Sequence, residues 1–293
     1  MRNALSIFIY RKDDMIYCLR LTTLLATLLS ITFSSTTFAI SPSVSEVKDT
    51  RTTGKFFAGC EVEVSLVGDE MTDVIAMRKL VTSAIDDTGR DIRSTESENP
   101  DFEKVTQFTG NKVTLKLKNP ARKATSIKEI VGTIDLYLPK NDPQSVTEIS
   151  QPLLQSGKKI SVPSLTSSGV ALTLYTASDY TEHRKAEAAQ QALQQGLQNA
   201  FSQMLGGSMG SRDENSITFI ISDPQQRIVD LSFVTATGEP IKSNGSMTSR
   251  GKEVVKSLSF AAPIPSDAKL RIYLATEKSM VKLPLRLVDI ALP

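Results

Sequence analysis

The sequence is short of the side chains that most often build catalytic and metal sites. Its 293 residues include one histidine, two cysteines and no tryptophan. A zinc site made of His and Cys would therefore lack ligands, and a Ser-His-Asp triad would have to use His183, which lies in a polar segment with a helical pattern. Gly-rich phosphate loops of the GxxxxGK[ST] or GxGxxG type are absent. The sequence predicts no catalytic residues, no metal ligands and no cofactor.

Other scarcities narrow the classes of partner. Six tyrosines and no tryptophan are few for the exposed aromatic platforms typical of carbohydrate-binding modules. Lysine and arginine do not cluster as they do in proteins that bind nucleic acid through its phosphates. We therefore expect no nucleic-acid binding.

The N-terminus has the layout of a secretory leader. An uncharged apolar run of 13 residues, 21–33, follows Arg11, Lys12 and Arg20 and precedes Thr37-Phe38-Ala39. A membrane-spanning helix needs about 20 apolar residues, so the pattern predicts a signal peptide over residues 1–39, cut after Ala39. An uncleaved anchor or a buried helix is the alternative, and translation can start at Met1 or Met15. The predicted location is secreted or periplasmic, with no membrane span after cleavage.

Removal of the leader changes the charge and the cysteine count. Residues 1–39 carry four basic and two acidic side chains, so 30 of the 34 basic and 30 of the 32 acidic side chains remain. Cys18 leaves with the leader, and Cys60 then has no partner for an internal disulfide. Cys60 opens an alternating apolar run and is predicted to be a small buried side chain.

The mature chain is dominated by short runs with a period of two. Apolar residues alternate with polar ones over 60–66, 113–117, 134–138 and 170–174, and again over 217–221, 229–233, 270–274 and 281–287. This pattern is typical of antiparallel strands with one face in water. Pro284 cannot donate a ladder hydrogen bond, so the last run is predicted to be an edge strand.

From this pattern we predict a mainly β fold of two immunoglobulin-like antiparallel β-sandwich domains with one inserted α-helix. The predicted boundaries are an extended N-terminal segment over 40–58, a first sandwich over 59–165 and a second over 166–293. The halves also resemble each other: KLVTSAIDDTGRDI at 79–92 matches VDLSFVTATGEPI at 229–241. We interpret this match as a duplicated domain.

The triplet Asp87-Thr88-Gly89 raises the question of an aspartic peptidase, in which two carboxylates share one proton. The equivalent triplet in the second half is Ala236-Thr237-Gly238, which keeps Thr and Gly but not Asp. Thr88, Gly89, Thr237 and Gly238 are therefore predicted to form structural turns, with glycine supplying a positive φ. A hydrolase that uses Asp87 in a homodimer remains the alternative.

Two further polar motifs bear on the interpretation of the sequence. Asp86, Asp87 and Asp91 are oxygen ligands suited to calcium, but their spacing is not that of an EF-hand, and the question stays open. Asn244-Gly245 is a strong signal for a two-residue hairpin turn.

One segment, 181–207, breaks the β pattern and predicts a helical insertion. Thr181 is its predicted N-cap, and Gly206-Gly207 its end. Apolar residues follow one stripe at helical spacing, namely Ala186, Ala189, Leu193, Leu197, Ala200, Phe201 and Met204. The stripe is interpreted either as a cover for the chain's own sandwich or as a helix for docking and self-association over 181–205, and partial disorder is the third alternative.

The pairing of VTSAIDDTGRD at 81–91 with NPARKATSIKEIVGTIDLYLP at 119–139, after a secretory leader, resembles uncharacterised secreted bacterial proteins with immunoglobulin-like domains. The resemblance covers most of 59–155 and, more loosely, 216–293. It implies fold and location only. The sequence thus predicts a non-enzymatic extracytoplasmic binding or structural module that acts through protein–protein interaction.

Overall fold

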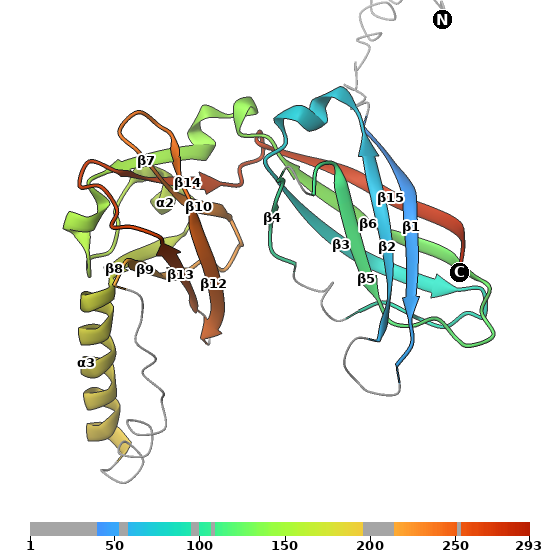
Figure 1. Ribbon diagram of the computed structural model, residues 1–293, viewed down its shortest axis with the longest axis horizontal. Helices are drawn as coiled ribbons and strands as arrows, with labels where there is room; N and C mark the ends of the chain where they lie inside the picture. The colour runs from blue at the N-terminus through green and yellow to red at the C-terminus, as the bar shows by residue number, and fades with distance from the viewer. Residues whose placement is uncertain (1–39, 53–57, 95–99, 107–108, 196–213, 251–252) are drawn as a thin grey trace, which may run out of the picture. The chain divides into compact units, whose positions relative to one another are not determined.

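The computed structural model describes residues 40–293 except 53–57, 95–99, 107–108, 196–213 and 251–252, and the side chains of 191–195 and 250. The predicted leader lies outside the described residues. One compact unit runs from Ala39 to Pro293, and it is mainly β, with four antiparallel sheets and few helices (Figure 1). No described helix has both the length and the apolar character that crossing a membrane requires.

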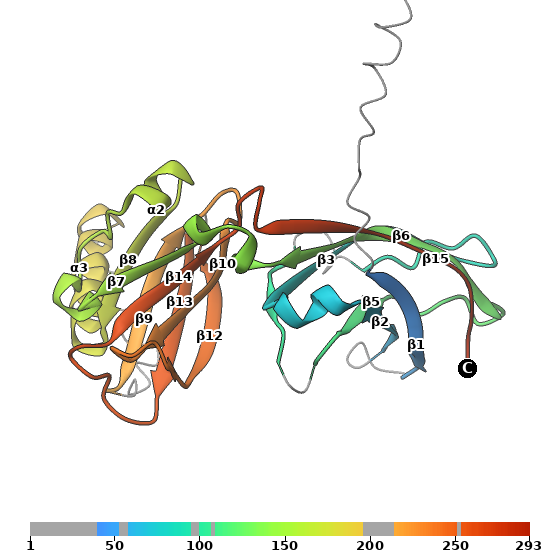
Figure 2. The same ribbon diagram turned by 90° about the horizontal axis from the view of Figure 1, so that it is seen from above.

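Two of the sheets form what we call the first lobe. One sheet has the strand order β1-β2-β5, and the other has the order β15-β6-β3-β4. The strands are β1 (Ser41–Thr50), β2 (Gly59–Val67), β3 (Ala76–Asp86), β4 (Glu103–Lys104), β5 (Lys112–Leu117), β6 (Ser126–Tyr137) and β15 (Met280–Ala291). In Figure 2 the long strand β15 runs beside β6.

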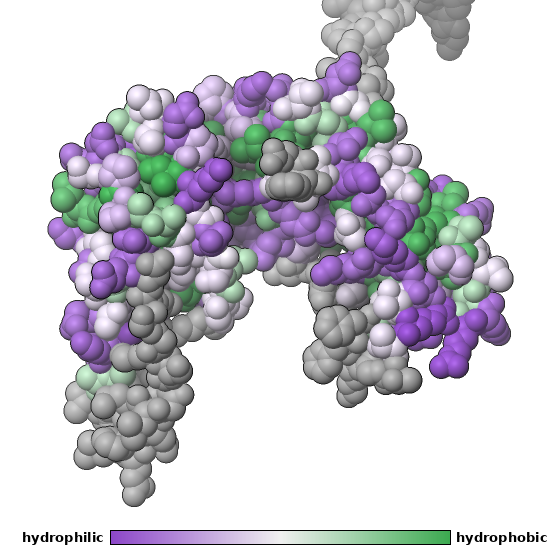
Figure 3. Space-filling model, in the orientation of Figure 1, coloured by the Kyte–Doolittle hydropathy of each residue, from purple (hydrophilic) through white to green (hydrophobic). Residues whose placement is uncertain are grey.

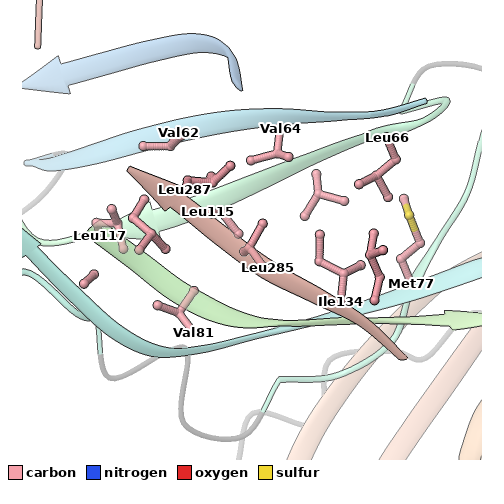
Figure 4. Packing of buried hydrophobic residues seen from close by; sticks show 14 of the residues in the cluster. Val62, Val64, Leu66, Met77, Val81, Leu115, Leu117, Ile134, Leu285 and Leu287 are labelled. Atoms are coloured by element: carbon pink, nitrogen blue, oxygen red, sulfur yellow. The ribbon is translucent and has the colours of Figure 1, made fainter. Parts of the chain in front are cut away.

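The predicted alternation builds the core of this lobe. Val62, Val64 and Leu66 of β2 point inward and are fully buried, while the residues between them face out (Figure 4). Leu285 and Leu287 meet them from the opposite sheet. Burying such side chains stabilises the fold by about 1.5–3 kcal/mol each. The period of two thus decides which face of each strand meets the other sheet.

The remaining two sheets form the second lobe. Their strand orders are β11-β10-β14-β7 and β12-β13-β9-β8. The strands are β7 (Val146–Ser150), β8 (Ala171–Thr176), β9 (Ser216–Ser222), β10 (Ile228–Val234), β11 (Pro240–Ile241), β12 (Ser243–Arg250), β13 (Glu253–Phe260) and β14 (Lys269–Leu274). Helices α2 (Pro163–Ser167) and α3 (Ala177–Gln195) flank β8. Phe219, Phe233 and Phe260 pack together in the core between the sheets, with the rings of Phe233 and Phe260 edge to face.

A third, smaller apolar cluster joins elements of both lobes. Tyr137 at the end of β6 is fully buried there with Val229 and Ala275. Its ring meets that of Tyr273 edge-on, with centroids 6.3 Å apart. The Tyr137 hydroxyl donates to the carbonyl of Ser145 at 3.0 Å, so the one polar atom of this buried side chain is satisfied.

Strand pairing differs from the predicted boundaries in two places. The predicted first sandwich ends at residue 165, but β7 pairs with β14 in the second lobe. The predicted second sandwich includes residues 280–293, but β15 pairs with β6 over Met280–Ala291 and completes the first lobe. A strand joins whichever sheet edge accepts its apolar face. β15 is separated from its partner β6 by the strands of the second lobe, so domains predicted as consecutive segments place the two strands in different domains.

The predicted extended segment 40–58 contains a strand. β1 pairs with β2 over its whole length, with a shift of register between Val44 and Glu46. Most β1 side chains are exposed, so the segment lacks the apolar alternation that marks the other strands. It is a strand because its backbone forms hydrogen bonds with β2, although most of its side chains are exposed.

Candidate functional site

The Asp87-Thr88-Gly89 triplet lies in a turn that is organised by Asp86, the residue directly before it. The Gly89 amide donates to the Asp86 carbonyl at 3.0 Å, and Gly89 has φ 84°, as the turn interpretation predicts. The buried Asp86 carboxylate accepts from the Thr88 amide (2.9 Å), the Thr88 hydroxyl (2.7 Å), the Arg90 amide (2.9 Å) and the Ala121 amide (2.8 Å). Burial disfavours the charged form, but these hydrogen bonds outweigh it and lower the pKa of Asp86 to about 2.

Asp87 also has a local structural partner. Its Oδ2 atom accepts from the Thr125 hydroxyl at 2.7 Å and from the Thr125 amide at 2.9 Å, just before β6 begins. These bonds lower the pKa of the Asp87 carboxyl. The carboxylate ties the turn to the neighbouring strand, which favours the turn interpretation over a proton-sharing pair.

The third acid of this loop does not join the other two. Oδ1 of Asp91 accepts from the amide of Arg93 at 2.9 Å, and the Asp91 side chain is exposed. Within the described part of the chain, no group of three or more His, Cys, Asp or Glu side chains is placed to hold a metal ion. The arrangement of Asp86, Asp87 and Asp91 therefore gives no support to a calcium site.

The corresponding turn in the second lobe repeats this pattern without a carboxylate. The Gly238 amide donates to the Thr235 carbonyl at 3.0 Å, and the Thr235 amide donates to the Glu239 carbonyl at 2.8 Å. Gly238 has φ 93°. The Thr235 hydroxyl accepts from the Glu239 amide at 3.1 Å and is 2.8 Å from the hydroxyl of Thr237. Thr235 thus occupies the position of Asp86, which the comparison of the triplets alone did not reveal.

Cys60 is a buried side chain in the first lobe, as predicted. It has no exposed surface and forms no disulfide. Burial raises the pKa of its thiol to about 11, so the reactive thiolate is disfavoured at neutral pH.

The helix begins earlier than predicted. α3 starts at Ala177, and the Thr176 hydroxyl accepts from the Asp179 amide at 3.3 Å, so Thr176 and not Thr181 caps the helix. Thr181 lies inside the first turns, where its hydroxyl donates to the carbonyl of Ala177 at 2.9 Å. Thr176 is also the last residue of β8, so strand and helix meet without a loop.

A different face of α3 from the predicted stripe packs on the second lobe. Tyr180 is buried, and the ring of His183 stacks on that of Tyr175 of β8, with centroids 4.7 Å apart and planes at 25°. Nε2 of His183 lies 3.5 Å from Oε1 of Glu187. Tyr180, His183 and Glu187 are spaced by three and four residues and form one face of the helix.

The predicted interaction stripe is described only in part. Ala186 and Ala189 are exposed, so this portion of the stripe does not cover the chain's own lobe. Leu193 lies in the helix, but its side chain is among those not described. Leu197, Ala200, Phe201 and Met204 lie outside the described residues. In Figure 3 the described part of α3 is largely hydrophilic.

The prediction of a hairpin turn at Asn244-Gly245 is wrong. Both residues lie in β12, where Asn244 pairs with Ser259 and Gly245 with Leu258 of β13. A Cβ on Gly245 would lie 3.3 Å from the Leu258 side chain, so glycine leaves room for this neighbour. The dipeptide serves close cross-strand packing here, and the ladder continues to the pair Arg250–Glu253.

β12 is an edge strand with its free side in water. From Ser243 to Ser249 every residue is exposed, and none carries a charge. Its eight residues contain no proline, and its pairing with β13 is regular throughout. Met247 is one of the few large apolar side chains exposed in the described chain, at 51%. Such an edge presents unpaired backbone groups to any strand that approaches.

The two other long edges, β1 and β15, carry protective features. β1 contains Pro42 and the register shift between Val44 and Glu46. β15 contains Pro284, and its place at the end of the strand order confirms the predicted edge. Proline and irregular pairing both interrupt the row of backbone groups that a new strand would need. An open groove of about 540 Å³ lies between these strands, lined by apolar residues such as Val44, Val288 and Ile290.

The short edges are protected by length and charge. β4 and β11 have two residues each. β7 has five residues, and its Glu148 is paired with Arg271 at 2.7 Å and with Lys269 at 3.3 Å. β5 has six residues and carries Lys112 and Lys116. Short and charged edges are poor templates for strand addition.

The edge at β8 is already covered. The Gly157 amide donates to the Leu174 carbonyl and the Ile160 amide to the Leu172 carbonyl, both at 2.8 Å. Residues 157–160 therefore occupy part of the free side of β8. Among the edges of the described sheets, β12 combines length, regularity and exposure.

No protein-family model, curated protein or solved structure matches this chain.

Proposed function

We propose that this chain is a non-enzymatic extracytoplasmic module that joins protein chains through the free edge of β12. The observation that carries the proposal is the regular strand from Ser243 to Ser249, which has no charge and in which every residue is exposed. An extended segment that pairs with such an edge gains main-chain hydrogen bonds along its length. Binding by strand addition needs no cofactor and no catalytic group.

The finer architecture belongs to the same proposal. We infer two immunoglobulin-like domains derived from one duplicated unit, exported by the N-terminal leader. The matching turns after β3 and β10, with Asp86 and Thr235 in equivalent positions, support the duplication. Helix α3, whose Ala186 and Ala189 are exposed, offers a second surface for a protein partner or for self-association.

A hydrolase based on Asp87 is the weaker alternative. Oδ2 of Asp87 accepts hydrogen bonds from the amide and the hydroxyl of Thr125, which supports a structural role for this carboxylate. If the alternative were right, Asp87→Asn would abolish a peptidase activity while leaving the melting temperature unchanged. We expect this variant to keep every binding activity of the parent protein.

The proposed function is tested by blocking the edge. Ser246→Lys with Thr248→Lys adds to β12 the charges that other edges carry. The wild-type protein should be recovered outside the cytoplasm in a complex larger than one chain, and the double variant should be recovered as a single chain. The matched control, Val44→Lys with Val288→Lys, adds the same charge to β1 and β15 and should keep the complex. A complex that survives the β12 variant would refute the proposed function.

A further inference from the structure

The partner that best fits β12 is another β12. The strand carries no charge from Ser243 to Ser249, so two copies can lie side by side without like charges facing each other. It is regular over eight residues, so both copies offer ladders of the same length. We propose that β12 pairs antiparallel with β12 of a second copy of this chain, about a twofold axis at Met247. This inference rests on the proposed function of the same edge.

Geometry restricts the register of this pair. Residues that face each other across two strands lie on the same side of the sheet, and sides alternate along each strand. A twofold axis perpendicular to the sheet keeps each residue on its own side, so partners must be an even number of residues apart. An axis at Met247 meets this condition and pairs Ser246 with Thr248, Gly245 with Ser249, and Asn244 with Arg250 of the second copy.

The side chains favour this register over its neighbour. An axis at Met247 places the two exposed methionines against each other and puts hydroxyl groups of Ser246 and Thr248 in reach of hydrogen bonding. An axis at Ser246 would place Met247 opposite Gly245, which has no side chain to cover it. The first arrangement removes more apolar surface from water.

The same sheet has a feature that stops growth at two copies. Pairing at β12 joins two sheets of order β12-β13-β9-β8 into one continuous sheet, and its outer strands are then the two copies of β8. Residues 157–160 already bond to Leu172 and Leu174 of β8. The contact is isologous and leaves no second β12 free, so the assembly closes as a dimer.

A charge exchange at the axis tests the proposal with purified full-length protein. Met247→Lys and Met247→Glu each place two like charges opposite each other, and each should raise the dimer dissociation constant about tenfold. An equimolar mixture should restore the dimer, because Lys then faces Glu. The control pair Ser249→Lys and Ser249→Glu lies on the same strand face, but residue 249 faces Gly245, so mixing should restore nothing. Sedimentation velocity measures each mass.

A cysteine pair tests the register. In a Cys18→Ser background, Met247→Cys should form a covalent dimer under mild oxidation, because directly opposed residues have the Cα separation that disulfides need. Thr248→Cys faces residue 246 and should cross-link far less. Cys60 is buried and contributes no background.

The outcomes separate this inference from the proposed function. A wild-type protein that stays monomeric when purified, or a Lys and Glu mixture that gains nothing, overturns the pairing of two copies. If the native complex still depends on Ser246 and Thr248 in that case, β12 binds a different chain and the proposed function stands. If neither the purified dimer nor the native complex depends on β12, both fail.

Discussion

At the scale of single residues, the turn after β3 shows how one buried carboxylate organises a loop. Asp86 accepts four hydrogen bonds from the backbone and side chains of the turn and of Ala121. The carboxylate of Asp87, the residue that resembles a catalytic aspartate, accepts from the amide and hydroxyl of Thr125. Both carboxylates thus connect the turn to neighbouring segments of the chain, at Ala121 and at Thr125.

Asp86 should give the fold a measurable sensitivity to acid. Its folded-state pKa of about 2 lies below the unfolded value of about 3.9, so the ionised form stabilises the fold above pH about 4. This contribution is lost as pH falls from about 4 through about 2. Asp86→Asn should lower the free energy of unfolding by about 1–3 kcal/mol at pH 7, since an amide cannot accept all these donors.

Urea unfolding at several pH values checks this prediction. The variant should lose part of the slope between pH about 4 and about 2 that the parent shows. Asp91→Asn is the matched control, because Asp91 is an exposed acid of the same loop, and it should keep the slope. Equal slopes in parent and Asp86→Asn would contradict the role assigned to Asp86.

At the scale of elements, α3 is anchored at one end. Thr176 caps the helix, and Tyr180 and His183 pack against Tyr175, while Ala186 and Ala189 are exposed. Among the described side chains of α3, the buried and half-buried ones that pack on β8 therefore lie toward its N-terminal end. The segment beyond Glu187 is not needed to complete the sheets of the second lobe.

Replacing residues 188–213 by a Gly-Ser linker of about 12 residues should leave the fold intact, because the loop-closure entropy changes little with length. Circular dichroism should keep its β character, and melting should stay cooperative. By contrast, Tyr180→Ala removes a buried ring and should lower the free energy of unfolding by roughly 2–4 kcal/mol. Aggregation of the linker variant would show that the replaced segment covers apolar surface of its own lobe.

At the scale of the whole molecule, the chain passes between the lobes twice. It leaves the first lobe after β6 and returns to it as β15, which pairs with β6 along its length. The pair Glu129–Arg286, 2.9 Å apart, joins residues 157 positions apart. The first lobe is therefore complete only when the last strand has been made, and the two lobes are not consecutive pieces of sequence.

The processed protein should begin at Ile40. The compact unit begins at Ala39, Ile40 is buried, and β1 starts at Ser41, so a cut after Ala39 would leave the described fold whole. N-terminal sequencing of protein recovered outside the cytoplasm measures this directly. Protein recovered in a membrane fraction with residues 15–33 still attached would show that the segment anchors the chain and is not a cleaved leader.

Much of the local structure follows from the sequence because its causes are local. Alternation placed Val62, Val64 and Leu66 in the core, and Gly89 and Gly238 adopt the positive φ that the turns require. Pro284 marked an edge because it lacks an amide hydrogen. Each of these outcomes depends on a residue and its immediate neighbours, and none depends on a distant part of the chain.

Long-range contacts decided the rest. Asn244-Gly245 has a strong local preference for a turn, but pairing with Ser259 and Leu258 keeps it in a strand. The segment 41–50 has little alternation and becomes β1 because β2 offers it a ladder. β15 joins the first lobe because β6 accepts its apolar face, although most of the second lobe separates them in sequence. The sequence alone determined which residues prefer strands, turns and burial. Only the tertiary structure decided which strands pair and which edges stay open, because a backbone hydrogen bond has no sequence signature and its partner is chosen by the fold.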